Sequence, residues 1–366
     1  MKTFGRELMP TLQDPIRIGD WELPNRVIMA PLTRTRSSAG RVPNDLMRQY
    51  YGQRAGAGLI ISEATSVSPM GVGYPDTPGI WSEEQVAGWK AVTKGVQSAG
   101  GRILLQLWHT GRVSDPIYLN GALPVAPSPI APAGHVRLIR PERPFVTPRA
   151  LELDEIPGII AEHKKAAENA MAAGFDGVEI AGTNGYLLDQ FLQDMSNHRT
   201  DEYGGSIENR ARLMLAVVDA VVSVWGPQRV GLHLNPRGDN NSMGDSNKAE
   251  TFGYVAREVS KRAIAFILAK ESLAEPRVGP LIRKAFGGVY IANDSFSQEA
   301  GDTMLANGEA DAVAYGRLFI ANPDLPRRFA LNAPLNAPDP QTFYGRQFGP
   351  KGYTDYPFLD EVERAA

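Results

Sequence analysis

Residues Gly174 to Arg210, GFDGVEIAGTNGYLLDQFLQDMSNHRTDEYGGSIENR, decide the fold. They open with the short apolar run Val178–Ile180, which predicts a buried strand, and continue into a polar loop that carries Asn184, Gly185 and Tyr186. Ser206 then has the residue type of a helix N-cap. One stripe of an amphipathic helix follows at Ile207, Ala211, Met214, Val218, Val221 and Trp225. The loop therefore lies at the C-terminal end of a strand, where parallel α/β barrels carry their chemistry.

The rest of the chain repeats this strand–loop–helix unit. Further strands are predicted at Val27–Ala30, Gly58–Ala64, Ile103–Trp108, Val230–Leu234, Ala265–Leu268, Val289–Ala292 and Ala312–Tyr315, and helices near Asp45–Arg54, Glu83–Gln97 and Ile156–Ala173. About eight such units close a (β/α)₈ TIM barrel. The alternation excludes all-β folds and helical bundles, but by itself it leaves an open doubly wound sheet possible.

The alternation is interrupted once, after the third strand. Residues from about Gly111 to Pro148 are rich in proline and glycine and have little helical periodicity. A loop of this length inside a compact domain is usually functional, often as a lid. No repeat, low-complexity tract or linker marks a second domain. We therefore expect a single barrel domain over residues 1–366, with a lid or insertion at about 111–148.

Composition limits the class of partner. The net charge of −3 argues against nucleic acid or an anionic membrane surface as a partner. No apolar run approaches the ~20 residues that span a bilayer, and the N-terminus lacks the apolar core of a signal peptide. With no cysteine, the chain has no disulfides and no thiol nucleophile. We expect a cytoplasmic enzyme, monomer or homodimer, that acts on a small molecule and binds neither nucleic acid nor membrane.

Three residues near the end of the chain suggest a phosphate site. In barrels that bind phosphate, the loops after strands seven and eight often hold it. Here the seventh predicted strand runs into Asn293, and Gly316 and Arg317 follow the eighth. The alternative, a turn glycine and a surface arginine, is about as probable. No GxGxxG motif is present, so a Rossmann site is not expected.

Metal and nucleophile chemistry lack their motifs. The five histidines, of which His163 fits a helix packing face, show no HExxH or paired spacing. Neither a GxSxG elbow nor a kinase signature occurs. A bound organic cofactor is therefore the expected source of reactivity.

Several motifs together resemble the old yellow enzyme family, and most closely its bacterial pentaerythritol tetranitrate, N-ethylmaleimide and glycerol trinitrate reductases. They are MAPLTRTR (Met29–Arg36), YYGQRAGAGLIISEAT (Tyr50–Thr65), LQLWHTGR (Leu105–Arg112), the central NGYLLDQFLQDMSNHRTDEYGGSIENRARL, FIANPDLPRRF and GYTDYP. The resemblance covers nearly the whole chain. It implies a barrel that binds FMN non-covalently and reduces activated alkenes with NAD(P)H.

The resemblance also implies roles for individual residues. It assigns cofactor binding to Pro31, Leu32, Thr33, Ala64, Gln106, His233, Asn293, Gly316 and Arg317. Gln106 suits the flavin pyrimidine edge because an amide supplies both a donor and an acceptor. A lone polar residue inside the apolar strand Ile103–Trp108 also needs a partner.

On the substrate side, the resemblance implies that Tyr186 is the proton donor and that Asn184 acts beside it. A phenol with a pKa near 10 stays protonated at neutral pH yet can donate to an enolate-like carbon. Substrate contacts are implied for Ala181, Asn184, Tyr74, Trp108 and Tyr353. Without the resemblance, the three aromatic residues would be equally consistent with ordinary core positions.

Two residues depart from the family pattern. The family pairs a histidine with the residue at Asn184, three positions earlier, where this chain has Ala181. Beside the flavin the family has arginine, a permanent cation, where this chain has His233. The expected function is an NAD(P)H-dependent flavin ene-reductase for enones, maleimides or nitro compounds. The alternatives are a flavin barrel with impaired alkene turnover, acting as an NAD(P)H oxidase or nitro-ester reductase, and a non-redox barrel.

Overall fold

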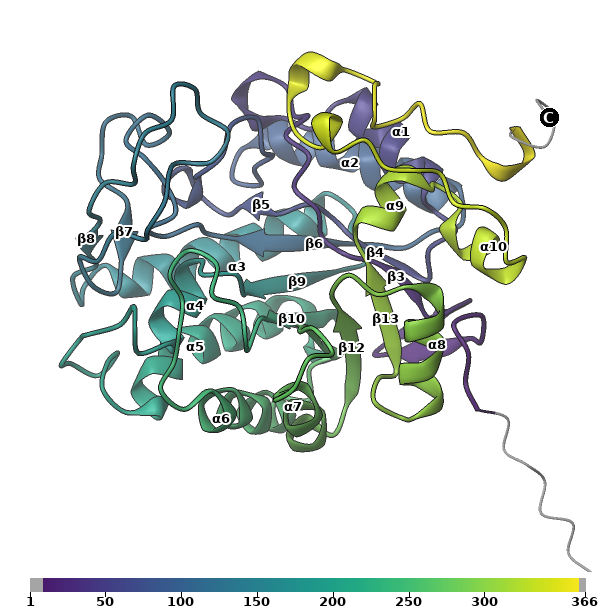
Figure 1. The fold of residues 1–366 in the computed structure, drawn as a ribbon. Helices are drawn as coiled ribbons and strands as arrows, with labels where there is room; N and C mark the ends of the chain where they lie inside the picture. The colour runs from purple at the N-terminus through teal and green to yellow at the C-terminus, as the bar shows by residue number, and fades with distance from the viewer. Residues whose placement is uncertain (1–8, 362–366) are drawn as a thin grey trace, which may run out of the picture.

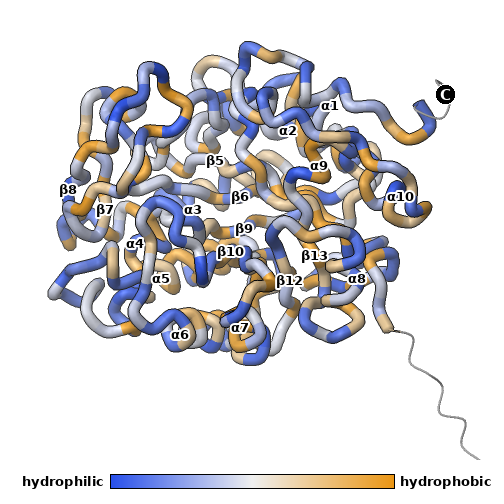
Figure 2. Tube along the Cα trace, viewed as in Figure 1, coloured by the Kyte–Doolittle hydropathy of each residue, from blue (hydrophilic) through white to orange (hydrophobic). Residues whose placement is uncertain are grey.

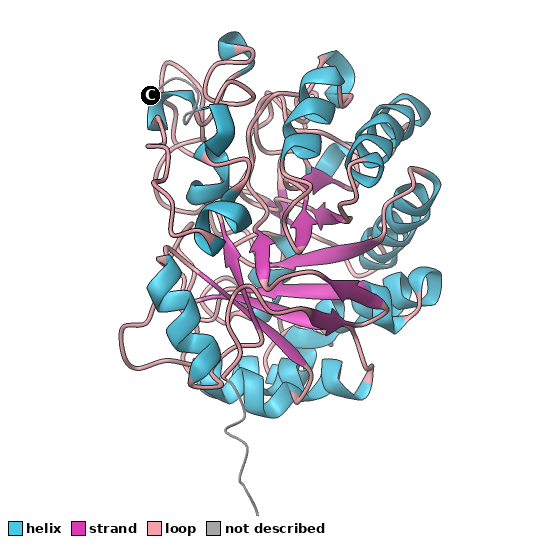
Figure 3. Cartoon of the chain, turned by 90° about the vertical axis from the view of Figure 1, so that its right-hand side faces the viewer, coloured by secondary structure: helices cyan, strands magenta, loops and turns pink. Residues whose placement is uncertain are grey.

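The computed structural model describes residues 9–361, and within them eight parallel strands form a closed barrel (Figures 1 and 3). The barrel strands are β3 (Val27–Met29), β4 (Leu59–Ile61), β6 (Ile103–Trp108), β9 (Gly177–Gly182), β10 (Val230–Leu234), β11 (Phe266–Lys270), β12 (Val289–Asn293) and β13 (Ala312–Tyr315). Each pairs with the next barrel strand in chain order, and β13 returns to β3. The predicted (β/α)₈ fold is confirmed, and the open sheet is excluded.

Helices surround the strands on the outside (Figure 3). They are α1 (Asp45–Gln53), α2 (Glu83–Ser98), α3 (Ile156–Ala172), α4 (Leu187–Leu192), α5 (Ile207–Trp225), α6 (Lys248–Lys261), α7 (Gly279–Phe286), α8 (Gln298–Ala306), α9 (Arg317–Ala321) and α10 (Leu325–Ala330). Short 3₁₀ turns lie at η1 (Ala39–Arg41), η2 (Pro69–Gly71), η3 (Pro227–Arg229), η4 (Pro340–Thr342) and η5 (Arg346–Phe348). Helix α5 begins after Ser206, whose side chain accepts a hydrogen bond from the Asn209 backbone N–H. The predicted N-cap is thereby confirmed.

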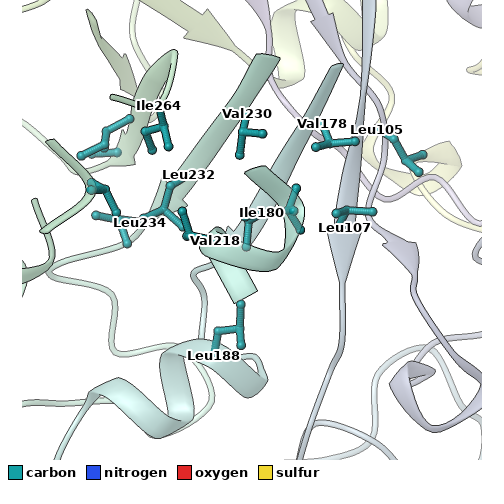
Figure 4. Packing of buried hydrophobic residues seen from close by; sticks show 14 of the residues in the cluster. Leu105, Leu107, Val178, Ile180, Leu188, Val218, Val230, Leu232, Leu234 and Ile264 are labelled. Carbon is teal, nitrogen blue, oxygen red and sulfur yellow. The ribbon is translucent and has the colours of Figure 1, made fainter. Parts of the chain in front are cut away.

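Alternation along the strands separates two apolar cores. Figure 4 shows Leu105, Val178 and Val230 from three neighbouring strands in the outer core, which also includes Val218 of α5. A separate cluster inside the barrel contains Leu104, Phe266 and Leu268, among others. In Figure 2 the apolar colour is concentrated on strands such as β12 and β13, and polar colour on loops around the rim. Residues that alternate with the outer set therefore face the barrel interior.

An N-terminal hairpin contributes to the interior cluster. Strands β1 (Ile16–Ile18) and β2 (Trp21–Leu23) pair antiparallel, and Ile18, Trp21 and Leu23 are buried with the inner residues. A Cβ on Gly177 would come within 2.7 Å of the Trp21 ring, so that ring packs directly against the start of β9. Because Gly177 is the first residue of β9, the hairpin covers the N-terminal end of the barrel. The opposite, C-terminal end is left for function.

The second strand is shorter than predicted. The prediction covered Gly58–Ala64, but β4 ends at Ile61. The chain then leaves the β4 path, and β5 (Thr65–Ser66) pairs with the end of β6 instead. Apolar residues alone could not reveal this change of partner, because both segments are buried.

The proline-rich segment 111–148 is irregular except for β7 (Val125–Ala126), which pairs in parallel with β8 (Arg149–Ala150). Its base is anchored by Arg112, whose guanidinium donates to the backbone carbonyls of Ile130, Asn241 and Ser242. A lid role for the segment stays a prediction. Among the described helices, none is both long and apolar enough to cross a membrane.

His163 provides a test of how the helical layer responds to pH. This side chain on α3 is buried, with its Nδ1 2.8 Å from the Ile159 carbonyl, as expected of a packing residue. Burial lowers the pKa of His163 to about 4. Below the unfolded value near 6.5, the unfolded chain therefore binds more protons than the folded one, and stability is lost as the pH falls toward 4.

Between pH 7 and pH 5, the buried His163 should lower the free energy of unfolding by about 2 kcal/mol. We expect urea unfolding of the wild type to lose that much more free energy between pH 7 and pH 5 than unfolding of His163→Gln. Equal losses in the two proteins would contradict the assignment.

Candidate active site

The C-terminal ends of the strands hold two adjoining cavities. The larger cavity, of about 540 Å³, is lined by residues that include Asn184, His233, Lys270, Asn293 and Arg317. The aromatic cavity, of about 250 Å³, is lined by Thr33, Tyr74, Tyr186, Phe343 and Tyr344, among others. The two cavities share the lining residues Pro31, Leu32, Arg317 and Tyr344. They therefore form one recess at the end where the chemistry was predicted.

The three predicted phosphate residues all line the larger cavity. The β13–β3 pairing places Gly316 and Arg317, which follow β13, beside the loop that follows β3. A Cβ on Gly316 would approach Leu32 Cδ2 to 3.2 Å, so glycine keeps this wall open. Arg317 makes no side-chain hydrogen bond or ion pair with any other residue in the described range. The Asn293 side chain donates from Nδ2 to the Ala314 carbonyl at 2.8 Å, which ties the ends of β12 and β13 together.

Three polar side chains cluster inside the barrel, and one of them, His233, lines the larger cavity. Gln106, Glu179 and His233 are inner residues of β6, β9 and β10, neighbouring strands of the sheet. Gln106 Nε2 is 2.7 Å from Glu179 Oε2 and 3.3 Å from His233 Nδ1. Glu179 Oε1 and His233 Nε2 are buried without a hydrogen-bond partner among residues 9–361. Unpaired buried polar atoms are rare and call for an explanation, such as a ligand.

The aromatic residues form a compact cluster beside this group. Ala64, Trp108 and Ala181 pack together, with Tyr74 and Tyr186 against them. The rings of Trp108 and Tyr186 meet edge to face at 5.1 Å between centroids. The hydroxyls of Tyr74 and Tyr186 lie 3.2 Å apart. Trp108 Nε1 is a further buried donor that lacks a protein partner within the described residues.

Burial controls the ionisation of the two phenols. Loss of solvent raises the pKa of Tyr186 well above its ordinary value and also raises the pKa of Tyr74. Both hydroxyls consequently keep their protons through neutral and mildly alkaline pH. Tyr186 can therefore act as a proton donor but not as a phenolate base.

The turn that carries Asn184 is held rigidly. Asn184 has a φ of +55°, a left-handed conformation that asparagine tolerates better than most residues. Its Oδ1 accepts from Asn235 Nδ2 at 2.8 Å, and its backbone carbonyl accepts from Asn241 Nδ2 at 2.8 Å. The Asn184 amide is fixed through its oxygen, so its NH₂ group remains available as a donor toward the cavity that Asn184 lines.

Tyr353 does not belong to the lining of either cavity. Its ring is fully buried and stacks on Tyr50 at 4.0 Å, with the guanidinium of Arg34 4.9 Å from its centre. This stack packs the C-terminal segment against α1. The substrate contact implied by the resemblance is therefore not visible for this residue.

Sequence reasoning missed two residues of the site. Glu179 was counted within an apolar strand, although its charge and the alternation of β9 could have placed it inside the barrel. Asn235, immediately after β10, had no motif, and only the fold places it beside Asn184. No cluster of three or more potential metal ligands occurs among the described histidines and acidic residues.

Comparison with known proteins supports the similarity in both sequence and structure. Residues 11–336 match the profile of the NADH:flavin oxidoreductase / NADH oxidase family. The chain is 44% identical to 12-oxophytodienoate reductase 1 of Oryza sativa subsp. japonica over 369 residues, 96% of this chain and 94% of the relative. It is also 44% identical to 12-oxophytodienoate reductase 2 of Arabidopsis thaliana, over 98% of each chain.

Solved structures of similar proteins have the same fold as this chain. Morphinone reductase in complex with tetrahydroNAD superposes with a TM-score of 0.92 at 49% identity, covering 96% of this chain and 99% of that one. The old yellow enzyme homologue from Zymomonas mobilis gives a TM-score of 0.93 at 44% identity, covering 96% of this chain and 100% of that one.

Proposed function

Because the chain belongs to the NADH:flavin oxidoreductase / NADH oxidase family, we propose that it reduces the activated C=C bond of enones, maleimides or nitro compounds. It is an NAD(P)H-dependent flavin oxidoreductase with FMN as its cofactor. The non-redox alternative is thereby set aside. The observation that carries the choice of substrate class is Tyr186, a buried phenol in the wall of the recess whose raised pKa keeps it protonated at neutral pH, ready to donate.

The residues present fit an FMN molecule. A cavity of about 540 Å³ is within the usual range for cofactor sites. Arg317 in its lining is a cation with no partner among residues 9–361, suited to a phosphate. His233 also lines the cavity, and its Nε2 is a buried polar atom without a partner in the described chain, suited to a polar ring edge. Asp294 also lines the cavity, and its negative charge opposes the binding of a phosphate. Arg317 is therefore the cation on which we expect phosphate binding to depend most.

We assign the phosphate to Arg317 and Gly316, the pyrimidine edge to Gln106 and His233, and the rest of the ring to the segment Pro31–Thr33 and to Ala64. The amide nitrogen of Gln106 is engaged by Glu179, which leaves its oxygen as the group for the cofactor. When bound, the flavin accepts a hydride equivalent from NAD(P)H and passes it to the substrate.

The protein's own groups complete the addition to the alkene. The NH₂ group of Asn184, aimed by Asn235, donates to the carbonyl or nitro oxygen, where negative charge develops. The Tyr186 hydroxyl delivers a proton to the α-carbon. Trp108 and Tyr74 exclude water beside it.

Anaerobic half-reactions of the FMN-loaded protein test this proposal. NADPH should bleach the flavin absorption, and cyclohexenone should restore it. Bleaching without recovery would favour the second candidate, a flavin enzyme with impaired alkene turnover that acts as an NAD(P)H oxidase or nitro-ester reductase. The packing of Ala181 against Trp108, with no donor side chain at 181, is the observation that favours this candidate.

Arg317→Ala should weaken FMN binding. A hydrogen bond to a charged group contributes roughly 1.5–3 kcal/mol, which corresponds to about a 10- to 100-fold higher Kd. Titration of the apoprotein with FMN, followed by fluorescence quenching, measures it. Arg48→Ala is the matched control, because Arg48 pairs with Asp45 on an exposed part of α1. Equal affinity in the two variants would move the phosphate to another site.

A further inference from the structure

Gln106, Glu179 and His233 form a hydrogen-bonded group from which we assign the proton positions. The Gln106 nitrogen lies 2.7 Å from Glu179 Oε2 and donates one hydrogen to this carboxylate oxygen. Its second hydrogen points to His233 Nδ1, 3.3 Å away. His233 Nδ1 is then an acceptor, and the imidazole proton lies on Nε2, the atom without a protein partner in the described chain.

The Glu179 carboxyl group has one potential cationic neighbour among residues 9–361. Glu179 is fully buried, and within those residues His233 is the one group within 4 Å of its carboxylate that can become a cation, with Nδ1 3.7 Å from Oε2. The other charged groups that line the cavity are Lys270 at the end of β11, Asp294 after β12 and Arg317 after β13. A buried carboxylate without a cationic partner is costly, so further negative charge in the cavity would favour binding of a proton between Glu179 and His233.

We propose that the Glu179–His233 pair takes up one proton from solvent each time the bound flavin is reduced. The inference rests on the proposed position of FMN in this cavity. In the balanced step, the C4–H bond of the dihydronicotinamide breaks and an N–H bond forms on the flavin. The nicotinamide is oxidised by two electrons and the flavin is reduced. An O–H bond of a hydronium ion in the solvent then breaks, which leaves water, and its proton forms a bond to His233 Nδ1, which turns from Gln106 toward Glu179 Oε2.

Electrostatics makes this proton uptake specific to the reduced state. Reduction adds negative charge beside His233, and a nearby negative charge favours the protonated imidazole. An arginine at this position would already be charged and would take up nothing. Glu179 acts through His233 and is a positioning residue: it stabilises the new N–H on the side away from the cofactor.

The reduction potential of the holoenzyme measures the extra proton. We would titrate the bound flavin anaerobically with dithionite in the presence of reference dyes from pH 6 to 9, for wild type, His233→Arg and His233→Gln. One additional proton makes the reduction equilibrium tenfold less favourable per pH unit, about 30 mV for a two-electron couple. The wild-type potential should therefore fall more steeply with pH than that of either variant by this amount. Parallel lines would overturn the proposal.

Two further variants locate the proton. Glu179→Gln keeps the shape but removes the charge, and it should give a smaller slope than wild type. Lys270→Met removes the other nearby strand-end cation and should keep the wild-type slope. If the slope followed Lys270 instead, the assignment to Glu179 and His233 would be wrong.

Nitrogen NMR with ¹⁵N-histidine tests separately whether FMN binds beside His233 and whether His233 gains a proton when the flavin is reduced. The chain has five histidines, and the signal lost in His233→Gln identifies the one of interest. Oxidised FMN added to apoprotein should shift that signal. No shift would overturn the proposed cofactor position, and the inference with it.

Dithionite reduction should then move both imidazole nitrogens to protonated values. A shift on FMN binding without protonation on reduction would overturn the inference alone and leave the proposed function standing. Neither measurement depends on alkene turnover.

Discussion

Replacing Tyr186 with phenylalanine should leave the reduction of the flavin by NADPH near its wild-type rate and slow alkene reduction by about 10²–10⁴-fold, the range for loss of a general acid. The ring keeps its edge contact with Trp108, so the packing of the cluster is retained. Only the proton source is removed. Stopped-flow absorbance measures both half-reactions: NADPH against the oxidised enzyme, and cyclohexenone against the dithionite-reduced enzyme.

Tyr74→Phe is the matched control. It removes the hydroxyl 3.2 Å from that of Tyr186 but leaves the proposed donor in place, so its effect on the alkene half-reaction should be much smaller. Because burial raises the pKa of Tyr186 well above its ordinary value, ionisation of this phenol should not lower the alkene rate between pH 7 and 9. Equal slowing of both half-reactions in Tyr186→Phe would make Tyr186 a structural residue.

The parts of the fold that were predictable are those with enough residues to show a period. Helix α5 has a full apolar stripe and a capping serine, and both its start and its end follow from them. Strand β6 is a six-residue run that is apolar except for Gln106, and it was predicted with the correct bounds. By contrast, β1, β2 and α4 span fewer than two helical turns or strand repeats and showed no usable pattern. Their positions depend on burial against the barrel, which a local pattern does not contain.

In the candidate site, too, some residues could be predicted from the sequence and others could not. Arg317 was predicted from the end of the eighth strand and His233 from the family resemblance, and both line the larger cavity. The partners of these residues could not be predicted, because they come from other strands: Gln106 and Glu179 for His233, and Asn235 for Asn184. Whether each residue acts as assigned stays a prediction for the experiments above.

Ala181 stands where a side-chain hydrogen-bond donor would help the proposed reaction, and replacing it tests this role. In the proposed mechanism Asn184 supplies one side-chain donor toward the substrate oxygen, and Ala181, its neighbour in the inner wall, supplies none. A missing donor to developing negative charge typically costs ~2.7–4 kcal/mol, or about 10²–10³ in rate. Ala181→His should therefore accelerate the reoxidation of reduced enzyme by cyclohexenone by up to that factor. Reduction by NADPH should change less, because the nicotinamide carboxamide can find other partners.

The size of the acceleration in Ala181→His depends on the space available for the imidazole. Ala181 is almost fully buried against Ala64 and Trp108, so the imidazole must project toward the cavity or displace the indole. Ala181→Leu is the matched control, since it adds a side chain of similar size that has no donor and should give no acceleration. If Ala181→His reoxidises no faster than Ala181→Leu, the substrate oxygen already has a second donor. Trp108 Nε1, which is buried without a partner in the described chain, is then the first group to test, by Trp108→Phe.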